Sequence, residues 1–257
     1  MKIDKIYCIN MENRTDRKEK MIKLFNKLGG IFDNYQFFKA IKGKDIPTDE
    51  LNNLLAPNAW YTINIHRNDY KQICSLGAVG CYLSHYNIWK EIIENDYKNV
   101  IIFEDDITTN LNYKQIMEYI NTLPSDYDYA NLSYWYPLGY ELKEVNNKWS
   151  TSKDVNIVWS NAYIISNKGA KKLIKKALPM SLQVDIYVNI ISATDPSFKR
   201  YFSNIDVFPQ EDILIGSDIQ DLCVKCIITE VSNKLINESN CYFSMILIIL
   251  ILLIKYL

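Results

Sequence analysis

The sequence predicts an α/β fold in which a mixed central sheet is flanked by helices. Short apolar runs typical of buried strands alternate with segments of helical spacing along most of the 257 residues, and this alternation is typical of α/β proteins. Apolar residues make up 48% of the chain and charged residues 23%, which indicates a globular protein with a substantial core. The length suits one α/β domain, with or without a small appendage.

The first elements are a strand and a helix. Residues 5–10 form an apolar run that ends at a polar residue, as buried strands do. Residues 14–28 place apolar side chains at helical spacing on one face, and Gly29-Gly30 ends this helix. The next elements are a strand over residues 35–41, a turn over residues 42–44 and a short helix that opens at Pro47.

The strongest helical pattern covers residues 77–95, where Val79, Leu83 and Tyr86 begin one apolar stripe. A compact apolar strand follows at residues 100–103. The later elements are a helix over residues 113–120, strands within 128–134 and 155–166 with a polar loop or hairpin between them, a helix over 167–178 that Pro179 stops, and a strand over 200–208.

Charge and cysteine content narrow the function classes. The net charge is −1, with 29 basic and 30 acidic residues, so there is no electrostatic reason to expect a nucleic-acid partner. The first residues lack the basic-then-apolar pattern of a signal peptide. We therefore expect a cytoplasmic location with free thiols, and we interpret Cys223 and Cys226 as ordinary thiols because no second pair or histidine accompanies them.

Three carboxylates, Glu104, Asp105 and Asp106, directly follow an apolar strand. Strand ends at one edge of an α/β sheet are where ligands collect, and carboxylate oxygens suit Mg²⁺ or Mn²⁺, which commonly bridge protein carboxylates to phosphates. The motif therefore makes these residues candidate metal ligands. Taken alone, it also fits a solvated loop or a helix cap.

Two glycines, Gly77 and Gly80, lie at the start of the helix over residues 77–95. They would permit close approach of a ligand to the backbone, at a helix end that favours anions. His85 lies two turns into the same helix. It is a candidate site residue, and the alternative is a core histidine held by hydrogen bonds.

Polar side chains after the first strand and in a late helix complete the candidate site. Arg14 and Arg17, one turn apart at a helix start after Asn10, could grip a diphosphate, or they could be solvated. Asp185 lies beside apolar residues in a helix after Pro179. It is a candidate general base, and the alternative is an exposed helix residue.

The order of these motifs resembles glycosyltransferase family 25. Residues 5–17, with Asn10, Arg14 and Arg17, are similar to the opening of that family, although Met11 stands where leucine is usual. The segments that carry the rest of the resemblance are Gly77 to His85, the strand with Glu104-Asp105-Asp106, Ala162 to Ala170, Val184-Asp185, Pro209-Gln210 and Ser217 to Ile219. Together they cover about residues 1–219.

This resemblance implies a GT-A-like nucleotide-sugar transferase fold and transfer of a hexose with inversion. The implied donor is a UDP-sugar, usually UDP-galactose, and the implied metal is Mn²⁺ or Mg²⁺. The implied acceptor is a hydroxyl of a glycan, as in lipopolysaccharide, or of a protein, as in collagen.

The resemblance also implies roles for individual residues. Asp105 and Asp106, helped by Glu104, would hold the metal. Asn10 and Arg14 would border the nucleotide pocket, and Arg17, Gly77 and Gly80 complete the candidate set for binding the nucleotide-sugar. His85 would lie near the donor, and Asp185 is the candidate base. The alternatives are a non-catalytic member that binds sugar-nucleotide or glycan, and a different metal-dependent phosphoryl-transfer enzyme.

The end of the chain differs in composition from the rest. We expect a catalytic domain over residues 1–220, a linker over 221–240 and a short hydrophobic tail over 241–257. Residues 243–254 are almost uniformly apolar. Twelve helical residues span roughly 18 Å, which is short of a hydrocarbon core of about 30 Å. This tail could give weak membrane association, or it could pack against protein.

Overall fold

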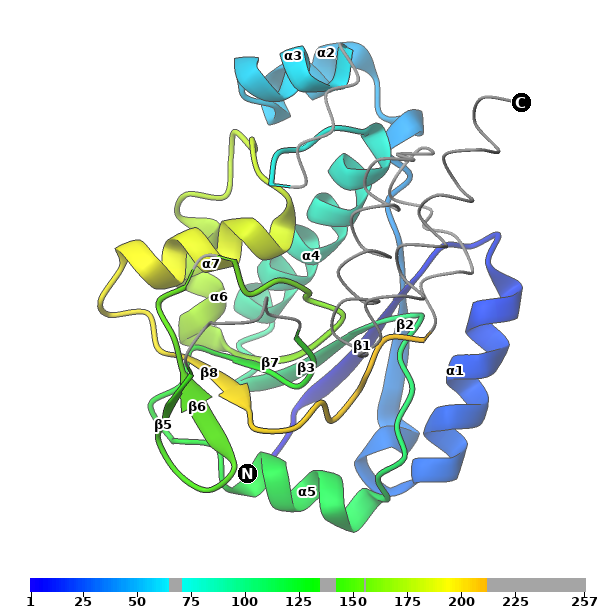
Figure 1. Cartoon of the computed structure of the whole chain (residues 1–257). Helices are drawn as coiled ribbons and strands as arrows, with labels where there is room; N and C mark the ends of the chain where they lie inside the picture. The colour runs from blue at the N-terminus through cyan, green and yellow to red at the C-terminus, as the bar shows by residue number, and fades with distance from the viewer. Residues whose placement is uncertain (65–70, 135–141, 155, 212–257) are drawn as a thin grey trace, which may run out of the picture.

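The fold is an eight-stranded mixed sheet with helices on both faces, in the computed structural model that describes residues 1–64, 71–134, 142–154 and 156–211 (Figure 1). This confirms the predicted α/β class. The strands are β1 (Lys5–Asn10), β2 (Tyr35–Lys39), β3 (Asn99–Glu104), β4 (Tyr129–Asn131), β5 (Lys143–Glu144), β6 (Trp149–Thr151), β7 (Ala162–Ser166) and β8 (Arg200–Ser203).

The helices alternate with the strands over most of this length. They are α1 (Thr15–Leu28), α2 (Thr48–Leu54), α3 (Pro57–Asn64), α4 (Leu76–Glu94), α5 (Tyr113–Asn121), α6 (Asn167–Ile174) and α7 (Val184–Thr194), with short 3₁₀ helices η1 (Gly30–Asn34) and η2 (Gly43–Asp45).

The strand order is β2-β1-β3-β7-β4-β8-β6-β5. Strand β1 runs parallel to both β2 and β3, and β7 runs antiparallel to its neighbours β3 and β4. Strand β4 therefore points the same way as β1 and β3. The carboxyl ends of these three strands meet at one edge of the sheet, and the amino end of β7 lies at that edge too.

Alternate residues of the central strands belong to two separate hydrophobic cores. One face of the sheet packs under α4, α6 and α7, and its core includes Trp89, Ile102 and Tyr163. The other face packs under α1 and α5, and its core includes Phe25 and Phe103. The period of two along a strand sends successive side chains to opposite faces, so both faces of this sheet are apolar.

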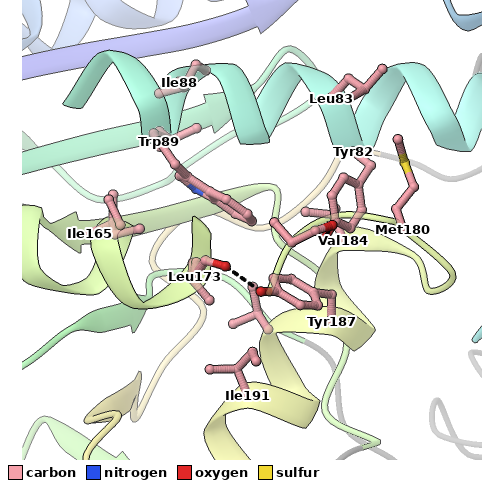
Figure 2. Packing of buried hydrophobic residues seen from close by; sticks show 14 of the residues in the cluster. Tyr82, Leu83, Ile88, Trp89, Ile165, Leu173, Met180, Val184, Tyr187 and Ile191 are labelled. Carbon is pink, nitrogen blue, oxygen red and sulfur yellow. Dashed lines mark hydrogen bonds between the residues drawn. The ribbon is translucent and has the colours of Figure 1, made fainter. Parts of the chain in front are cut away.

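Figure 2 shows how α4, α6 and α7 meet in the first of these cores. Trp89 of α4 and Tyr187 of α7 lie over the sheet residue Ile165. The Tyr187 hydroxyl donates to the Leu173 carbonyl near the end of α6. This carbonyl belongs to the last turn of α6, and the Lys176 N–H beyond that helix also donates to it, at 3.4 Å. The hydrogen bond from Tyr187 therefore ties α7 to α6.

Most predicted elements are present, and several are shorter than predicted. The predicted strands within 128–134, 155–166 and 200–208 reduce to β4, β7 and β8, because only those residues pair within the sheet. The predicted helix over 167–178 ends at Ile174, where the chain continues in tighter turns. Helix α3 was not predicted, although Pro57 at its first position is a favourable start signal.

None of the helices in the described ranges is long and apolar enough to cross a membrane. The predicted linker and the apolar tail over residues 243–254 lie outside the described residues, as do Cys223 and Cys226.

Candidate active site

The candidate site lies at the sheet edge where the carboxyl ends of the parallel strands meet. Asn10 ends β1, Glu104 ends β3 and Asn131 ends β4. The segment before β7 runs along the same edge, because the Glu104 N–H donates to the Asn161 carbonyl at 2.8 Å. Such edges are where α/β proteins bind ligands, and most predicted site residues gather here.

Asp105 and Asp106 are held by side chains from the start of the chain and from its last described residues. Arg17 Nη1 lies 2.9 Å from Asp105 Oδ1 and 3.3 Å from Asp106 Oδ2. The Asn10 amide donates to Asp105 Oδ2 at 2.6 Å, and the Gln210 amide donates to Asp106 Oδ2 at 3.0 Å. The other Asp106 oxygen, Oδ1, is buried and has no hydrogen-bond partner among the described residues.

The site concentrates more negative charge than its cation balances. Burial raises the pKa of Asp105, against the hydrogen bonds from Arg17 and Asn10. Burial, followed by the charge of Glu104, raises the pKa of Asp106 to about 6. These shifts indicate carboxylates that lack enough positive partners, as expected of a site that binds a cation.

Glu104 faces the other side of the sheet from Asp105 and meets His85. His85 is fully buried, with Nε2 3.2 Å from Glu104 Oε1 and Nδ1 2.8 Å from the Tyr163 hydroxyl. The Cys81 Sγ, a ring nitrogen of His85 and a carboxylate oxygen of Glu104 all lie within 4.8 Å of one another. His85 is thus a hydrogen-bonded core histidine and also a neighbour of the acidic motif, so the two interpretations of the sequence are compatible.

Asp185 is the second residue of α7 and is half-buried. Its Oδ1 accepts the Ile186 N–H at 2.7 Å, and its Oδ2 accepts the Trp159 N–H at 3.1 Å. Burial raises the pKa of Asp185, the two backbone hydrogen bonds lower it, and the charge of Glu104 raises it further. Asp185 therefore lies within electrostatic reach of the acidic motif. Because Asp185 is half-buried and hydrogen-bonded, the alternative interpretation as an exposed helix residue is wrong.

Arg14 and the two glycines have local roles in the structure. Arg14 pairs with Asp16 at 2.9 Å, and its carbonyl accepts from Asn10 at 3.2 Å. A side chain on Gly80 would meet the Ile41 carbonyl oxygen at 2.2 Å, so this glycine permits close packing of α4 against residues 41–43. Gly77 lies in the first turn of α4, which the Ser75 side chain caps. Diphosphate binding by the arginines and glycines stays a prediction.

Sequence reasoning missed several residues of this site. Cys81 stands four residues before His85, and this helical spacing puts both on one face of α4. Burial, then the charges of Glu104 and Asp185, raise the pKa of the Cys81 thiol. Gln210 and Tyr163 stand within segments that carried the family resemblance, but no pattern marked them individually. Trp159 carried no sequence signal at all.

The residues present fit a hard divalent ion. Such ions take carboxylate oxygens, and the unpartnered Asp106 Oδ1 offers one. Asp105 and Asp106 share Arg17, whereas Glu104 groups with Cys81 and His85. The three predicted ligands therefore form two adjacent sets. The thiol of Cys81, with its raised pKa, suits the hard ion less well than the carboxylates do.

Comparisons with known proteins converge on one family. Residues 3–188 match the model described as "Glycosyltransferase family 25 (LPS biosynthesis protein)". A glycosyltransferase 25 family member of Aedes aegypti is 28% identical over 215 residues, which are 79% of this chain and 34% of that protein. Procollagen galactosyltransferase 1-A of Xenopus laevis is 29% identical over 231 residues, which are 84% of this chain and 36% of that protein.

The chain thus spans about a third of the length of these curated relatives. Among solved structures, it is similar to a glycosyltransferase involved in the glycosylation of the major capsid of PBCV-1. That likeness has a TM-score of 0.36 and 11% identity, and it covers 66% of this chain and 64% of the other.

Proposed function

The chain belongs to glycosyltransferase family 25, and on this premise we propose that it transfers galactose from UDP-galactose to a hydroxyl, with inversion and with help from Mn²⁺ or Mg²⁺. The acceptor is a glycan or protein hydroxyl. The observation that carries the proposal is the gathering of acidic side chains at one sheet edge, where Arg17 pairs with Asp105 and Asp106 and one Asp106 oxygen is buried without a partner among the described residues. Asp185 lies in a helix about 80 positions further along the chain, and the charge of Glu104 contributes to its raised pKa.

The binding of a divalent ion would fall to Asp105 and Asp106, with Glu104 beside them. When bound, such an ion supplies positive charge that stabilises the diphosphate leaving group. Asn10 and Arg17 hold Asp105 in place from β1 and α1. Arg17 is also a cation at this edge, and we propose that its guanidinium contacts a phosphate oxygen of the donor, since guanidinium groups bind phosphates as well as carboxylates.

Asp185 is proposed to take the proton of the acceptor hydroxyl as that oxygen attacks the anomeric carbon. Each of its oxygens accepts one backbone N–H, and a carboxylate retains further lone pairs for a substrate proton. The raised pKa of Asp185 makes it a stronger base than an exposed aspartate. No covalent enzyme intermediate is needed, because inversion requires a single displacement.

His85 contacts the acidic motif through Glu104. It is enclosed by Trp89 and Tyr163 in the core, and it reaches Glu104 through Nε2. This placement fixes the orientation of the Glu104 carboxylate near the proposed ion. The alternative of a non-catalytic binding domain would be favoured if no carboxylate faced the acidic motif. Asp185 is our candidate for that carboxylate, because the charge of Glu104 acts on it.

The test is release of UDP from a panel of UDP-sugars, with and without Mn²⁺. We expect metal-dependent release from UDP-galactose, its loss in the Asp105→Asn/Asp106→Asn variant, and a fall in transfer rate of about 10²- to 10⁴-fold in Asp185→Asn. The matched control is Asp49→Asn/Glu50→Gln, which removes two neighbouring exposed carboxylates from α2. Binding of UDP-sugar without turnover, in a folded protein supplied with acceptors, would support the non-catalytic alternative.

A further inference from the structure

A second group of buried polar residues contacts the segment that precedes β7, which also donates a backbone N–H to Asp185. Asn131 and Asn189 are fully buried, and Arg200 is 2% exposed. They come from β4, α7 and β8, so three separate elements converge on this point. Burial of an arginine and two amides is costly unless hydrogen bonds offset the loss of water.

Arg200 sets the orientation of both amides. Its Nε donates to Asn131 Oδ1 at 2.9 Å, and its Nη1 donates to Asn189 Oδ1. An arginine can only donate hydrogen bonds. Each asparagine must therefore turn its oxygen toward Arg200 and its NH₂ group away from it.

Both NH₂ groups then donate to the segment that precedes β7. Asn131 Nδ2 donates to the Trp159 carbonyl at 3.2 Å, and Asn189 Nδ2 donates to the Ile157 carbonyl. Asn189 and Asp185 are four residues apart in α7, so they share one face of that helix. The segment is thus held at two carbonyls by amides and at the Trp159 N–H by Asp185.

Trp159 has a backbone conformation that needs such support. Its φ is +79°, in the left-handed region that a side chain as large as tryptophan rarely adopts. Strained backbone persists where surrounding contacts over-determine it, and it clusters at functional sites. Here the contacts that enforce it also point the Trp159 N–H at Asp185 Oδ2.

We propose that Asn131, Asn189 and Arg200 are positioning residues for Asp185, because they hold Trp159 in the conformation in which its N–H fixes the Asp185 carboxylate. This inference rests on the proposed function of Asp185 as the base. A base must lie within hydrogen-bond reach of the proton it takes, and a small misplacement lowers the rate without weakening substrate binding. The other groups that act electrostatically on Asp185 or are influenced by it are Glu104 of β3, Cys81 of α4, Tyr129 of β4 and Arg200 itself.

The matched control is Asn167. It is also a buried asparagine that donates to two backbone carbonyls, those of Ile92 at 3.0 Å and Tyr97 at 3.1 Å. It starts α6, directly after the end of β7 that is opposite the site. Asn167→Ala therefore has the same kind of structural cost as Asn131→Ala, without any link to Asp185.

The first measurement needs no activity. Amide hydrogen exchange at Trp159, followed by NMR, should accelerate strongly in Asn131→Ala and Asn189→Ala and stay protected in Asn167→Ala. If Asn131→Ala fails to fold, Asn189→Ala carries the test, since it leaves the sheet unchanged. Retained protection of the Trp159 N–H in a folded Asn131→Ala or Asn189→Ala protein would overturn the proposal, whether or not the protein turns over substrate.

The second measurement is kinetic. We expect kcat to fall by about ten- to a hundredfold in Asn131→Ala, with the acceptor KM little changed. In an Asp185→Asn background the same substitution should add almost nothing, whereas Asn167→Ala should have the same small effect in both backgrounds. If Asn131→Ala lowers kcat as much in the Asp185→Asn background as in the wild type, the positioning role is refuted. Wild-type activity in Asp185→Asn alone would instead refute the proposed base.

Discussion

At the scale of single residues, Asp106 shows the conflict between charge and burial that this site contains. Its side chain is only 16% exposed, one oxygen has no partner among the described residues, and its pKa is raised to about 6. When the pKa of a carboxyl is higher in the folded than in the unfolded state, ionisation of that carboxyl lowers the free energy of unfolding. At neutral pH and without a bound cation, Asp106 therefore destabilises the fold.

Asp106→Asn should consequently stabilise the metal-free protein, by about 1–3 kcal/mol at pH 8. The amide keeps an acceptor for Arg17 and Gln210 but carries no charge. The advantage should shrink as pH falls through about 6, because wild-type Asp106 then becomes protonated. Urea unfolding of both proteins from pH 4 to pH 8, in the presence of EDTA, measures this difference. An advantage of constant size across that range would contradict the predicted ionisation.

At the scale of elements, α4 links the site to the fold. Cys81 and His85 project from one face toward Glu104. Near them, Gly80 and Ser84 fasten the helix to residues 41–43, because the Ile41 N–H donates to Ser84 Oγ at 2.8 Å and Gly80 leaves room for the Ile41 carbonyl. The same helix therefore anchors the loop after β2 and presents the histidine.

Gly80→Ala should destabilise the protein by about 1–3 kcal/mol through overpacking. This sign is opposite to the usual effect in a helix, where alanine is favoured over glycine by about 1 kcal/mol. The new methyl group would lie 2.2 Å from the Ile41 carbonyl oxygen, and backbone cannot yield as a flexible side chain can. Chemical denaturation gives the comparison, with exposed Lys90→Ala in the same helix as a control. A stability equal to or above wild type would show that residues 41–43 move freely.

At the scale of the whole molecule, the sheet separates two apolar cores and carries a charged, largely buried edge between them. Trp89 and Phe103 illustrate the two cores, which lie on opposite faces. Packing therefore stabilises the body of the fold, and at the acidic edge Arg17 pairs with both aspartates. Ligand binding to the folded state should raise the stability of the entire domain.

Mn²⁺ together with UDP should raise the melting temperature of the wild-type protein by several degrees. Saturation at about 100 times Kd adds about 2.7 kcal/mol, and each kcal/mol corresponds to roughly 2–4 °C at this chain length. Differential scanning fluorimetry should show no such rise for Asp105→Asn/Asp106→Asn. An equal rise in that variant would place the ion elsewhere.

Local sequence patterns predicted the class of the fold and most of its elements. The apolar stripe of α4, the glycine that ends α1 and the compact run of β3 each depend on residues close in sequence, so periodicity and turn chemistry reveal them. The acidic motif after β3 was visible for the same reason. The trimmed strands at 128–134 and 200–208 show the limit of such patterns, because sheet partners decide where pairing stops.

By itself, then, the sequence determined the α/β class, the order of its main elements and the candidates Glu104, Asp105, Asp106, His85 and Asp185. Only the tertiary structure decided the strand order, the pairing of Arg17 with two aspartates and the contact between Trp159 and Asp185. Those contacts join residues from 26 to 89 positions apart, and no local periodicity encodes them. They follow from the packing of the helices on the sheet, which brings distant side chains to one edge.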